Sequence, residues 1–249
     1  MSSEIRIGVV VFPGSNCDQD MIDALSVYPD VKVSKLWHKE HDLKNSDLVV
    51  LPGGFSFGDY LRSGAIARFS PIMHEVTGFA QKGGYVFGVC NGFQVLCESK
   101  LLPGALLHNT SNRFICKNIW IRPEAGESAI TRHLHPEKAL KIPIAHGEGR
   151  FFAHEDTLKS ITEQGQIIFR YCGPQGEIHD QYNPNGAIEN IAGVCNKNRN
   201  VFGMMPHPER AADSKLGNTD GRLILDGLLS ALFGVSPLAG SLETHIVST

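Results

Sequence analysis

The chain has 249 residues, 42% of them hydrophobic, and its 23 Lys and Arg against 26 Asp and Glu give a formal net charge of −3. A chain of this length can bury a large core without disulfide or metal support. Basic and acidic residues nearly balance, so the chain offers no basic stripe for nucleic acid. No apolar run approaches the ~20 residues that span a bilayer. The N-terminus lacks a signal-peptide pattern. We therefore expect a cytoplasmic protein with no nucleic acid or membrane partner.

Strand-like runs and helix-like segments alternate along the first half of the chain. The runs that predict strands are residues 5–12, 31–37, 47–51 and 85–89. Apolar residues recur at helical spacing between Met21 and Tyr28, and a second helical stretch is expected over residues 59–80, interrupted at Pro71. Near-continuous hydrophobic strands separated by helices indicate an α/β fold with a mostly parallel sheet covered on both faces.

The second half is less regular and carries further strand-like runs. These runs are residues 114–121, 141–145, 166–171, 191–195 and 201–205. Turn signals mark residues 173–190 as an exposed excursion or hairpin, and a final helix is expected over residues 220–233. No linker divides the chain, so we predict a single domain over residues 1–233 and a loosely ordered tail over residues 234–249.

Neither the cysteines nor the histidines indicate a disulfide framework or a metal site. The six cysteines include no C-x-x-C pair and no zinc-finger spacing, so we expect them to stay reduced and most of them to be buried. His133 and His135 are spaced as a metal pair but lack a third ligand, which favours solvated loop histidines. Residues 13–16 resemble a phosphate-binding turn but lack the glycine and lysine pattern of a nucleotide site.

The sharpest local signal is a strand that runs into the pattern G-x-C-x-G at residues 88–92. Glycines two positions on either side of Cys90 allow a sharp turn and leave its side chain uncovered at the carboxyl end of the strand. The helix-compatible stretch that follows would place the sulfur at a helix N-terminus, which favours the thiolate, a nucleophile for acyl transfer. The alternative is a tight turn in which Cys90 is merely buried.

A base and an orienting group for such a nucleophile come from the sequence PHPER at residues 206–210. The two flanking prolines are predicted to hold the segment extended, so that His207 and Glu209 point to the same side. The carboxylate could then accept a hydrogen bond from one imidazole nitrogen and leave the other nitrogen for the sulfur. Alone, this turn is more often a surface feature; with the Cys90 turn it indicates a Cys-His-Glu triad.

Paired glycines follow the third predicted strand, in the sequence LPGGF at residues 51–55. Glycines at a strand end let the backbone present N–H groups at close range, and Gly54 is the favoured donor. Together with the N–H of Asn91, it would form an oxyanion hole for a tetrahedral intermediate. The alternative is a simple turn that ends the strand.

These motifs together resemble the class I, or triad type, glutamine amidotransferases. Longer blocks narrow the resemblance to the glutaminase subunits of phosphoribosylformylglycinamidine synthase, an enzyme of purine biosynthesis. The blocks are PGSNCD at residues 13–18, PGGFSFGDYLRSGAIAR at 52–68, GVCNGFQ at 88–94, IPIAHGEGRF at 142–151 and GMMPHPERA at 203–211. The resemblance covers most of the chain.

The resemblance implies a flavodoxin-like, doubly wound sheet and a triad of Cys90, His207 and Glu209 that hydrolyses L-glutamine to glutamate and ammonia. The positions that it implies for holding glutamine are Gln94, His146 and Gly147. The ammonia would pass to a separate synthetase subunit, which uses ATP and Mg²⁺ to convert formylglycinamide ribonucleotide to the amidine, and a third small bridging subunit is a further candidate partner. No cofactor is expected on this chain itself.

Other functions stay open from the residues alone. The chain could be the amidotransferase subunit of a different synthetase, or a cysteine peptidase or other hydrolase on a similar sheet. The PHPER spacing and the paired glycines argue against a peptidase. A docking subunit with a vestigial site is disfavoured because all three residue types of the triad are present.

Overall fold

The computed structural model describes residues 4–124 and 128–238, and most of its strands join one sheet. The strands of this sheet are β1 (Ile5–Val11), β2 (Val31–Trp37), β3 (Leu48–Leu51), β4 (Tyr85–Val89), β6 (Ile115–Pro123), β7 (Leu140–His146), β9 (Ile167–Cys172), β10 (Ile191–Cys195) and β11 (Val201–Met204). Their order across the nine-stranded sheet is β2-β1-β3-β4-β11-β10-β9-β6-β7. A separate two-stranded sheet pairs β5 (Ala105–Leu107) with β8 (Arg150–Phe152).

The sheet is mixed, but most of its strands run in one direction. Neighbouring strands from β2 to β11 pair in parallel, whereas those from β11 to β7 pair antiparallel. Only β6 and β10 of this sheet therefore point the opposite way. The antiparallel half follows from short connections such as the one between β10 and β11, because a short turn can join only antiparallel neighbours. The prediction of a mostly parallel sheet is confirmed.

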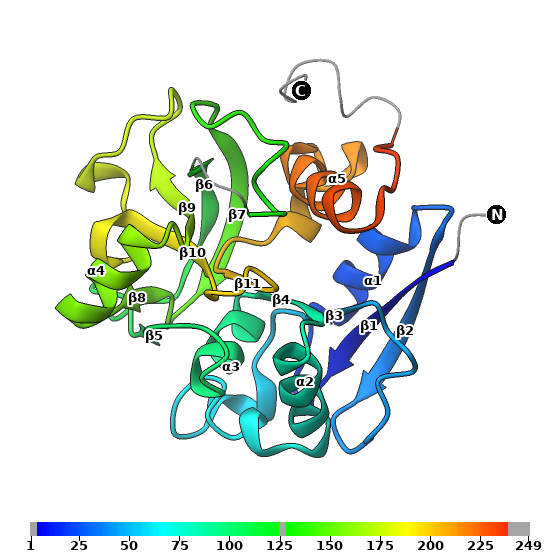
Figure 1. The fold of residues 1–249 in the computed structure, drawn as a ribbon. Helices are drawn as coiled ribbons and strands as arrows, with labels where there is room; N and C mark the ends of the chain where they lie inside the picture. Colours follow the sequence, from blue (N-terminus) through cyan, green and yellow to red (C-terminus); the bar gives the residue numbers. More distant parts are fainter. Residues whose placement is uncertain (1–3, 125–127, 239–249) are drawn as a thin grey trace.

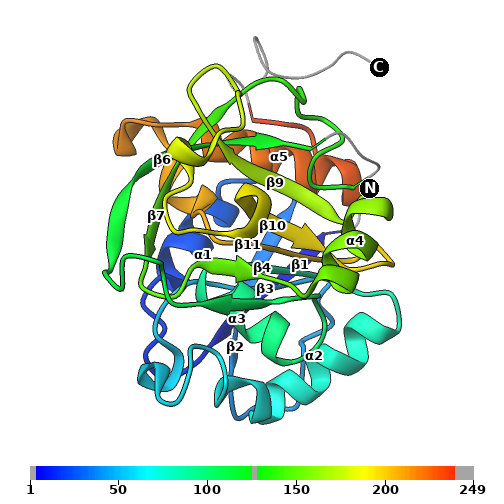
Figure 2. The same ribbon diagram turned by 90° about the vertical axis from the view of Figure 1, so that its left-hand side faces the viewer.

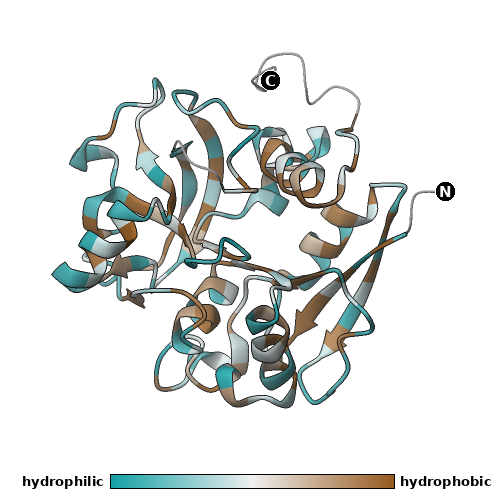
Figure 3. Cartoon of the chain, in the orientation of Figure 1, coloured by the Kyte–Doolittle hydropathy of each residue, from teal (hydrophilic) through white to brown (hydrophobic). Residues whose placement is uncertain are grey.

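Helices cover both faces of the sheet and make a three-layered molecule (Figures 1 and 2). On one face lie α1 (Asp18–Ser26) and α5 (Asp220–Phe233), and on the other lie α2 (Pro71–Gln81) and α3 (Asn91–Glu98). A further helix, α4 (Glu155–Glu163), lies near β9. The central strands are strongly hydrophobic along their length (Figure 3), as strands buried on both faces must be.

Two predicted segments differ in the structure. Residues 59–70 form no α-helix, because Asp59, Leu61 and Gly64 have left-handed backbone angles, with φ of 53°, 73° and 81°, which a right-handed helix cannot contain. Residues 173–190 form no hairpin and are exposed only in part. Asn185 is fully buried and donates to the carbonyl of Gly149 at 2.8 Å, so the excursion returns to the core.

The structure describes only the first part of the predicted tail. Residues 234–238 form no helix or strand, and Gly234 caps α5 with a φ of 69°. Residues 239–249 lie outside the described residues. All six cysteines are free, and only Cys116 is exposed, in agreement with the sequence prediction.

Candidate active site

The predicted nucleophile lies in a sharp turn between β4 and α3. Strand β4 ends at Val89 and helix α3 begins at Asn91, so Cys90 alone makes the change of direction. Its φ of 50° and ψ of −107° are a strained conformation for a residue with a Cβ atom. The Cys90 side chain is 5% exposed, at the carboxyl end of a central strand. This geometry is that of a nucleophile elbow.

The glycines on either side of Cys90 are required by close packing. A Cβ atom on Gly88 would lie 2.5 Å from Leu96 Cδ1, and one on Gly92 would lie 1.9 Å from the carbonyl oxygen of Leu51. Helix α3 thus approaches β3 and β4 more closely than any side chain at these positions permits. The sequence pattern G-x-C-x-G therefore reflects the distance between the helix and the sheet as well as the turn itself.

Replacing Gly92 with Ala is expected to lower the free energy of unfolding by about 3 kcal/mol. The added methyl group would overlap a backbone oxygen, which cannot move without shifting β3. Gly78 in α2 offers a matched control because no atom lies within 4 Å of its Cβ position. Gly78→Ala should stabilise the protein by about 0.5–1 kcal/mol. Urea unfolding of both variants measures the difference, and equal midpoints would contradict the packing argument.

The predicted base, His207, lies in the same pocket as Cys90 because β11 pairs with β4. The two strands pair in parallel, with Met204 opposite Val89, so both deliver the residues that follow them to the same edge of the sheet. The N–H of Cys90 donates to the carbonyl of Met204 at 2.8 Å, and the N–H of His207 donates to the carbonyl of Pro143 at 2.9 Å. The structure therefore brings two distant sequence motifs to one place.

His207 and Glu209 form a buried pair. His207 Nδ1 lies 2.6 Å from Glu209 Oε1, and the two side chains are 1% and 0% exposed. The prediction of an extended segment is wrong beyond His207, because Pro208 starts a short 3₁₀ turn, Pro208–Ala211. Proline is favoured at the first position of such a turn, where its fixed φ already suits the helix and its missing N–H is not needed. The turn places the carboxylate beside the imidazole.

The charges around His207 favour its protonated form. Burial lowers the pKa of this imidazole, but the carboxylate of Glu209 and the sulfur of Cys90 outweigh it and raise the pKa to about 10. His207 Nε2 is buried and has no hydrogen bond of ordinary geometry within the described residues. That nitrogen is the one that could exchange a proton with the sulfur, since contacts of this kind are often loose until substrate is bound.

The two backbone N–H groups predicted to form an oxyanion hole, those of Gly54 and Asn91, remain candidates for it. Gly54 lines the same pocket as Cys90, and its place is set by an antiparallel bridge to Ser15. A Cβ atom on Gly54 would lie 2.8 Å from Ser15 Cα, so this approach requires glycine. Among the described residues, neither the N–H of Gly54 nor that of Asn91 donates to another group. Both are therefore available to a developing oxyanion.

Gln94 is placed beside the site but not in the lining of its pocket. The Asn91 side chain accepts from the N–H of Ser56 at 3.2 Å and donates to Gln94 Oε1 at 2.9 Å. Gln94 Nε2 in turn donates to the carbonyl of Glu148 at 2.6 Å. Both ends of the Gln94 amide are thus committed within the protein. In the structure this residue supports the residue after the nucleophile.

His146 and Gly147 lie at the end of β7, behind the pocket. His146 Nδ1 lies 3.1 Å from Asn109 Oδ1, and the carbonyl of Gly147 accepts from the N–H of Asn109 at 2.9 Å. Burial, and then the neighbouring charge of His207, lower the pKa of His146 to about 4, so it is neutral at neutral pH. The structure does not bring either residue into the lining of the Cys90 pocket.

The pocket over the candidate triad has a volume of about 110 Å³. Besides Cys90, His207 and Gly54, it is lined by Asn16, Cys17, Phe55, Phe114, Ala145 and Arg210. Phe55 and Phe114 are 42% and 53% exposed, with ring centroids 6.2 Å apart, and form an aromatic lip. All but Phe114 lie inside motifs that the sequence had singled out, but nothing in the motifs predicts that they share one pocket.

Cys17 and Arg210 form a second polar contact in this pocket. Arg210 Nη2 donates to Cys17 Sγ at 3.0 Å, and Arg210 Nε donates to Asp20 Oδ2 at 3.1 Å. Burial raises the pKa of Cys17 to about 12, although Arg210 opposes the shift. A Cβ atom on Gly53 would lie 2.6 Å from His207 Cε1 and 3.1 Å from Cys17 Sγ, so Gly53 leaves room for both side chains.

The described part of the chain contains neither a metal-binding cluster nor a membrane-spanning helix. No group of three or more His, Cys, Asp or Glu residues is placed there to hold a metal ion. None of the helices in residues 4–124 and 128–238 is both long enough and apolar enough to cross a bilayer.

Comparison with known proteins gives a single consistent family. The model of the CobB/CobQ-like glutamine amidotransferase domain matches residues 4–220. The phosphoribosylformylglycinamidine synthase subunit PurQ of Chlorobium chlorochromatii is 54% identical over 94% of this chain and 100% of its own length. The subunit of the same name from Koribacter versatilis is 51% identical over 92% of this chain and 99% of its own.

A solved structure agrees with the sequence matches. A chain in the structure of PurLQS from Thermotoga maritima is 39% identical and superimposes with a TM-score of 0.80, covering 92% of this chain and 99% of that chain.

Proposed function

The chain belongs to the CobB/CobQ-like glutamine amidotransferase domain family, and from this premise we propose that it is the glutaminase subunit of phosphoribosylformylglycinamidine synthase. The subunit hydrolyses L-glutamine and delivers ammonia to a synthetase subunit for de novo purine biosynthesis. Identity of 54% across the whole length of a relative with that name supports this assignment over another amidotransferase. The likeness to a chain of PurLQS supports a complex with the synthetase and a third subunit.

One observation supports this chemistry most directly. Cys90, in its elbow, shares a pocket with His207, and His207 Nδ1 lies 2.6 Å from the buried carboxylate of Glu209. Cys90 as thiolate attacks the side-chain amide carbon of glutamine, and the carbonyl electron pair moves onto the oxygen. His207 gives its Nε2 proton to the amide nitrogen as the C–N bond breaks and ammonia leaves. The products of this half-reaction are ammonia and a glutamyl thioester.

The second half-reaction reuses the same groups. His207, now neutral, takes a proton from water, and the resulting hydroxide attacks the thioester carbon. The C–S bond then breaks, the new carboxylic acid gives its proton to solvent and leaves as glutamate, and the thiolate returns beside the imidazolium. The N–H groups of Gly54 and Asn91 stabilise the oxyanion in both halves, while Glu209 orients the imidazole and stabilises its positive charge.

The rest of the reaction belongs to the partner. The synthetase subunit binds ATP and Mg²⁺ and converts formylglycinamide ribonucleotide to the amidine with the ammonia that this chain supplies. No cofactor is required by the chemistry above, and a hydrolase for a free cytoplasmic amino acid fits a cytoplasmic location. The single domain over residues 1–233 and the roles of the triad residues are part of this proposal.

Labelling with a glutamine-analogue electrophile tests the proposal. A diazoketone analogue of glutamine should alkylate Cys90 and no other cysteine when the assembled complex is digested and mapped by mass spectrometry. Cys17 is the internal control, because it lines the same pocket but burial raises its pKa to about 12. A label on Cys17, or no label with the synthetase bound, would remove Cys90 as the nucleophile.

A further inference from the structure

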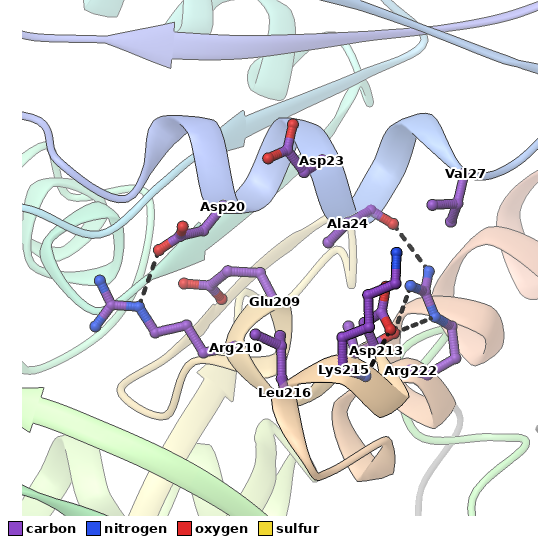
Figure 4. A pocket seen from close by; sticks show the side chains of 11 residues that line it. Asp20, Asp23, Ala24, Val27, Glu209, Arg210, Asp213, Lys215, Leu216 and Arg222 are labelled. Carbon is purple, nitrogen blue, oxygen red and sulfur yellow. Dashed lines mark hydrogen bonds and ion pairs between the residues drawn. The ribbon is translucent and has the colours of Figure 1, made fainter.

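Carboxylates from outside the catalytic pocket hold the candidate site from two sides. On the histidine side, Asp20 of α1 pairs with Arg210, the residue after Glu209, at 3.1 Å (Figure 4). On the other side, Asp59 accepts a hydrogen bond from the side chain of Asn91 at 3.1 Å. Asn91 directly follows the nucleophile, and its N–H is one of the two candidate oxyanion donors. Asp59 does not line the catalytic pocket, so any influence it has on the reaction must act through Asn91.

The side-chain amide of Asn91 is held by three partners. Its Oδ1 accepts from the N–H of Ser56 at 3.2 Å. Its Nδ2 donates to Gln94 Oε1 at 2.9 Å and to Asp59 Oδ1 at 3.1 Å, which accounts for both of its N–H donors. Asn91 is 2% exposed. The carboxylate of Asp59 also fixes the orientation of this amide, because a flipped amide would turn its oxygen toward a negative charge.

The segment that supplies Asp59 also supplies the other candidate oxyanion donor. Gly54 lies near the start of this segment, and the Asp59 carboxylate bonds to Asn91 from its middle. At its far end the N–H of Ser63 donates to Glu148 Oε2 at 3.2 Å. Because one segment carries the first donor and contacts the residue of the second, its bonds set the position of the two donors relative to each other.

The backbone of this segment is strained where it turns Asp59 inward. Left-handed φ angles occur at four of its residues, namely Phe57 (55°), Gly58 (72°), Asp59 (53°) and Leu61 (73°). Tyr60 and Leu61 are 73% and 93% exposed, whereas Asp59 is partly buried. Residues other than glycine keep such angles only where surrounding contacts stabilise them. The bond between Asp59 and Asn91 is one of these contacts.

Asp59 is ionised at neutral pH and therefore only accepts hydrogen bonds. Burial raises the pKa of its carboxyl group to about 6; the nearby Glu148 carboxylate adds to this shift, and hydrogen bonds with Ser63 and Asn91 oppose it. An ionised acceptor makes a stronger hydrogen bond than a neutral one. Without it, one N–H of the buried Asn91 amide loses its protein partner, and the amide is free to turn.

We propose that Asp59 is a positioning residue for glutamine hydrolysis: its bond to the Asn91 side chain aims the Asn91 N–H at the oxyanion and holds it at a fixed distance from the N–H of Gly54. This role rests on the proposed function, because the oxyanion forms on glutamine. Full charge develops on that oxygen in the transition state and not in bound glutamine. Loss of Asp59 is therefore expected to lower kcat and to leave KM nearly unchanged.

The assembled complex with the Asp59→Ala substitution tests this role. We expect kcat for glutamine hydrolysis to fall about 20-fold, less than the roughly 10²–10³-fold loss for a deleted oxyanion donor. KM for glutamine should stay within about twofold of the wild-type value. Lys100→Ala is the matched control, because Lys100 is left-handed with a φ of 60°, is exposed and lines a different pocket. Equal kcat in the two variants would overturn the proposal.

Two further measurements separate positioning from folding. Asp59→Asn keeps an oxygen that can accept from Asn91, so its kcat should lie within about threefold of wild type. The rate at which iodoacetamide alkylates Cys90 should be the same in all variants, because that reaction forms no oxyanion. An Asn variant as slow as the Ala variant would contradict the role as acceptor. A parallel fall in the alkylation rate would show that Asp59 only maintains the shape of the site, and either result would overturn the proposal.

The wild-type complex distinguishes the two possible failures. If it forms no glutamate from glutamine, the proposed function fails, and the role of Asp59 in that reaction fails with it. If wild type and Asp59→Ala hydrolyse glutamine equally fast, the proposed function stands and only the role of Asp59 is wrong.

Discussion

The Cys90→Ala variant is expected to lose glutamine-dependent amidine synthesis by about 10⁴-fold or more. Without the sulfur no glutamyl thioester forms, and the remaining N–H groups can only polarise a substrate that nothing attacks. Synthesis from free ammonia should continue at the wild-type rate, because that step takes place on the synthetase subunit. The two reactions are measured on the same reconstituted complex, with glutamine or ammonium chloride as the nitrogen source.

Cys116→Ala supplies the matched control for this variant. Cys116 is the exposed cysteine of the six, lies on β6 and does not line the pocket that holds Cys90. Both reactions should keep their wild-type rates in this control. Loss of the ammonia-dependent reaction in Cys90→Ala would mean that the site does not serve ammonia supply alone, and the assignment would fail.

The second large effect is expected for Glu209→Gln. The amide has nearly the shape of the carboxylate but carries no charge, so it cannot stabilise the imidazolium that forms at His207. We expect kcat for glutamine hydrolysis to fall by about 10³-fold with little change in KM. Glu163→Gln, at the exposed end of α4, is a matched control that should retain full activity. Equal activity of both variants would show that the 2.6 Å contact is only structural.

The same variant should change how stability depends on pH. His207 has a pKa of about 10 in the folded protein against an ordinary value of 6.5, so its protonation stabilises the fold fully below pH 6.5. This stabilisation is lost as the pH rises through 10. Glu209→Gln lowers the folded pKa of His207, so wild type should exceed the variant in unfolding free energy by more at pH 6.5 than at pH 10. Urea titrations at both values measure this, and a constant difference would contradict it.

The parts of the fold that follow from local pattern were predictable. The predicted ranges 31–37, 85–89, 191–195 and 220–233 agree with β2, β4, β10 and α5 at both ends. Helix α4 was not predicted, because its nine residues contain only two apolar side chains, Leu158 and Ile161, from which a helical period could be recognised. The irregular chain between residues 59 and 70 depends on left-handed residues whose angles no composition reveals.

Some features of the candidate site could likewise be predicted from the sequence, and others could not. Cys90, His207 and Glu209 were predicted because each lies in a short motif whose residue types carry the chemistry. The contact between Cys17 and Arg210 was not, because it depends on how α1 packs against the chain beyond β11. The inward turn of Gln94 toward Glu148 likewise depends on tertiary packing, since a buried amide takes whichever partners the fold provides.

The parallel pairing of β4 with β11 also governs when activity can first appear as the chain is made. A ribosome-bound chain that ends before β11 holds the elbow cysteine but neither the base nor its carboxylate. Bringing strands from distant parts of the sequence together is slow, since the intervening loop must be closed first. We therefore expect nascent and partly folded chains to be inert toward glutamine, so that ammonia release begins only once the sheet is complete.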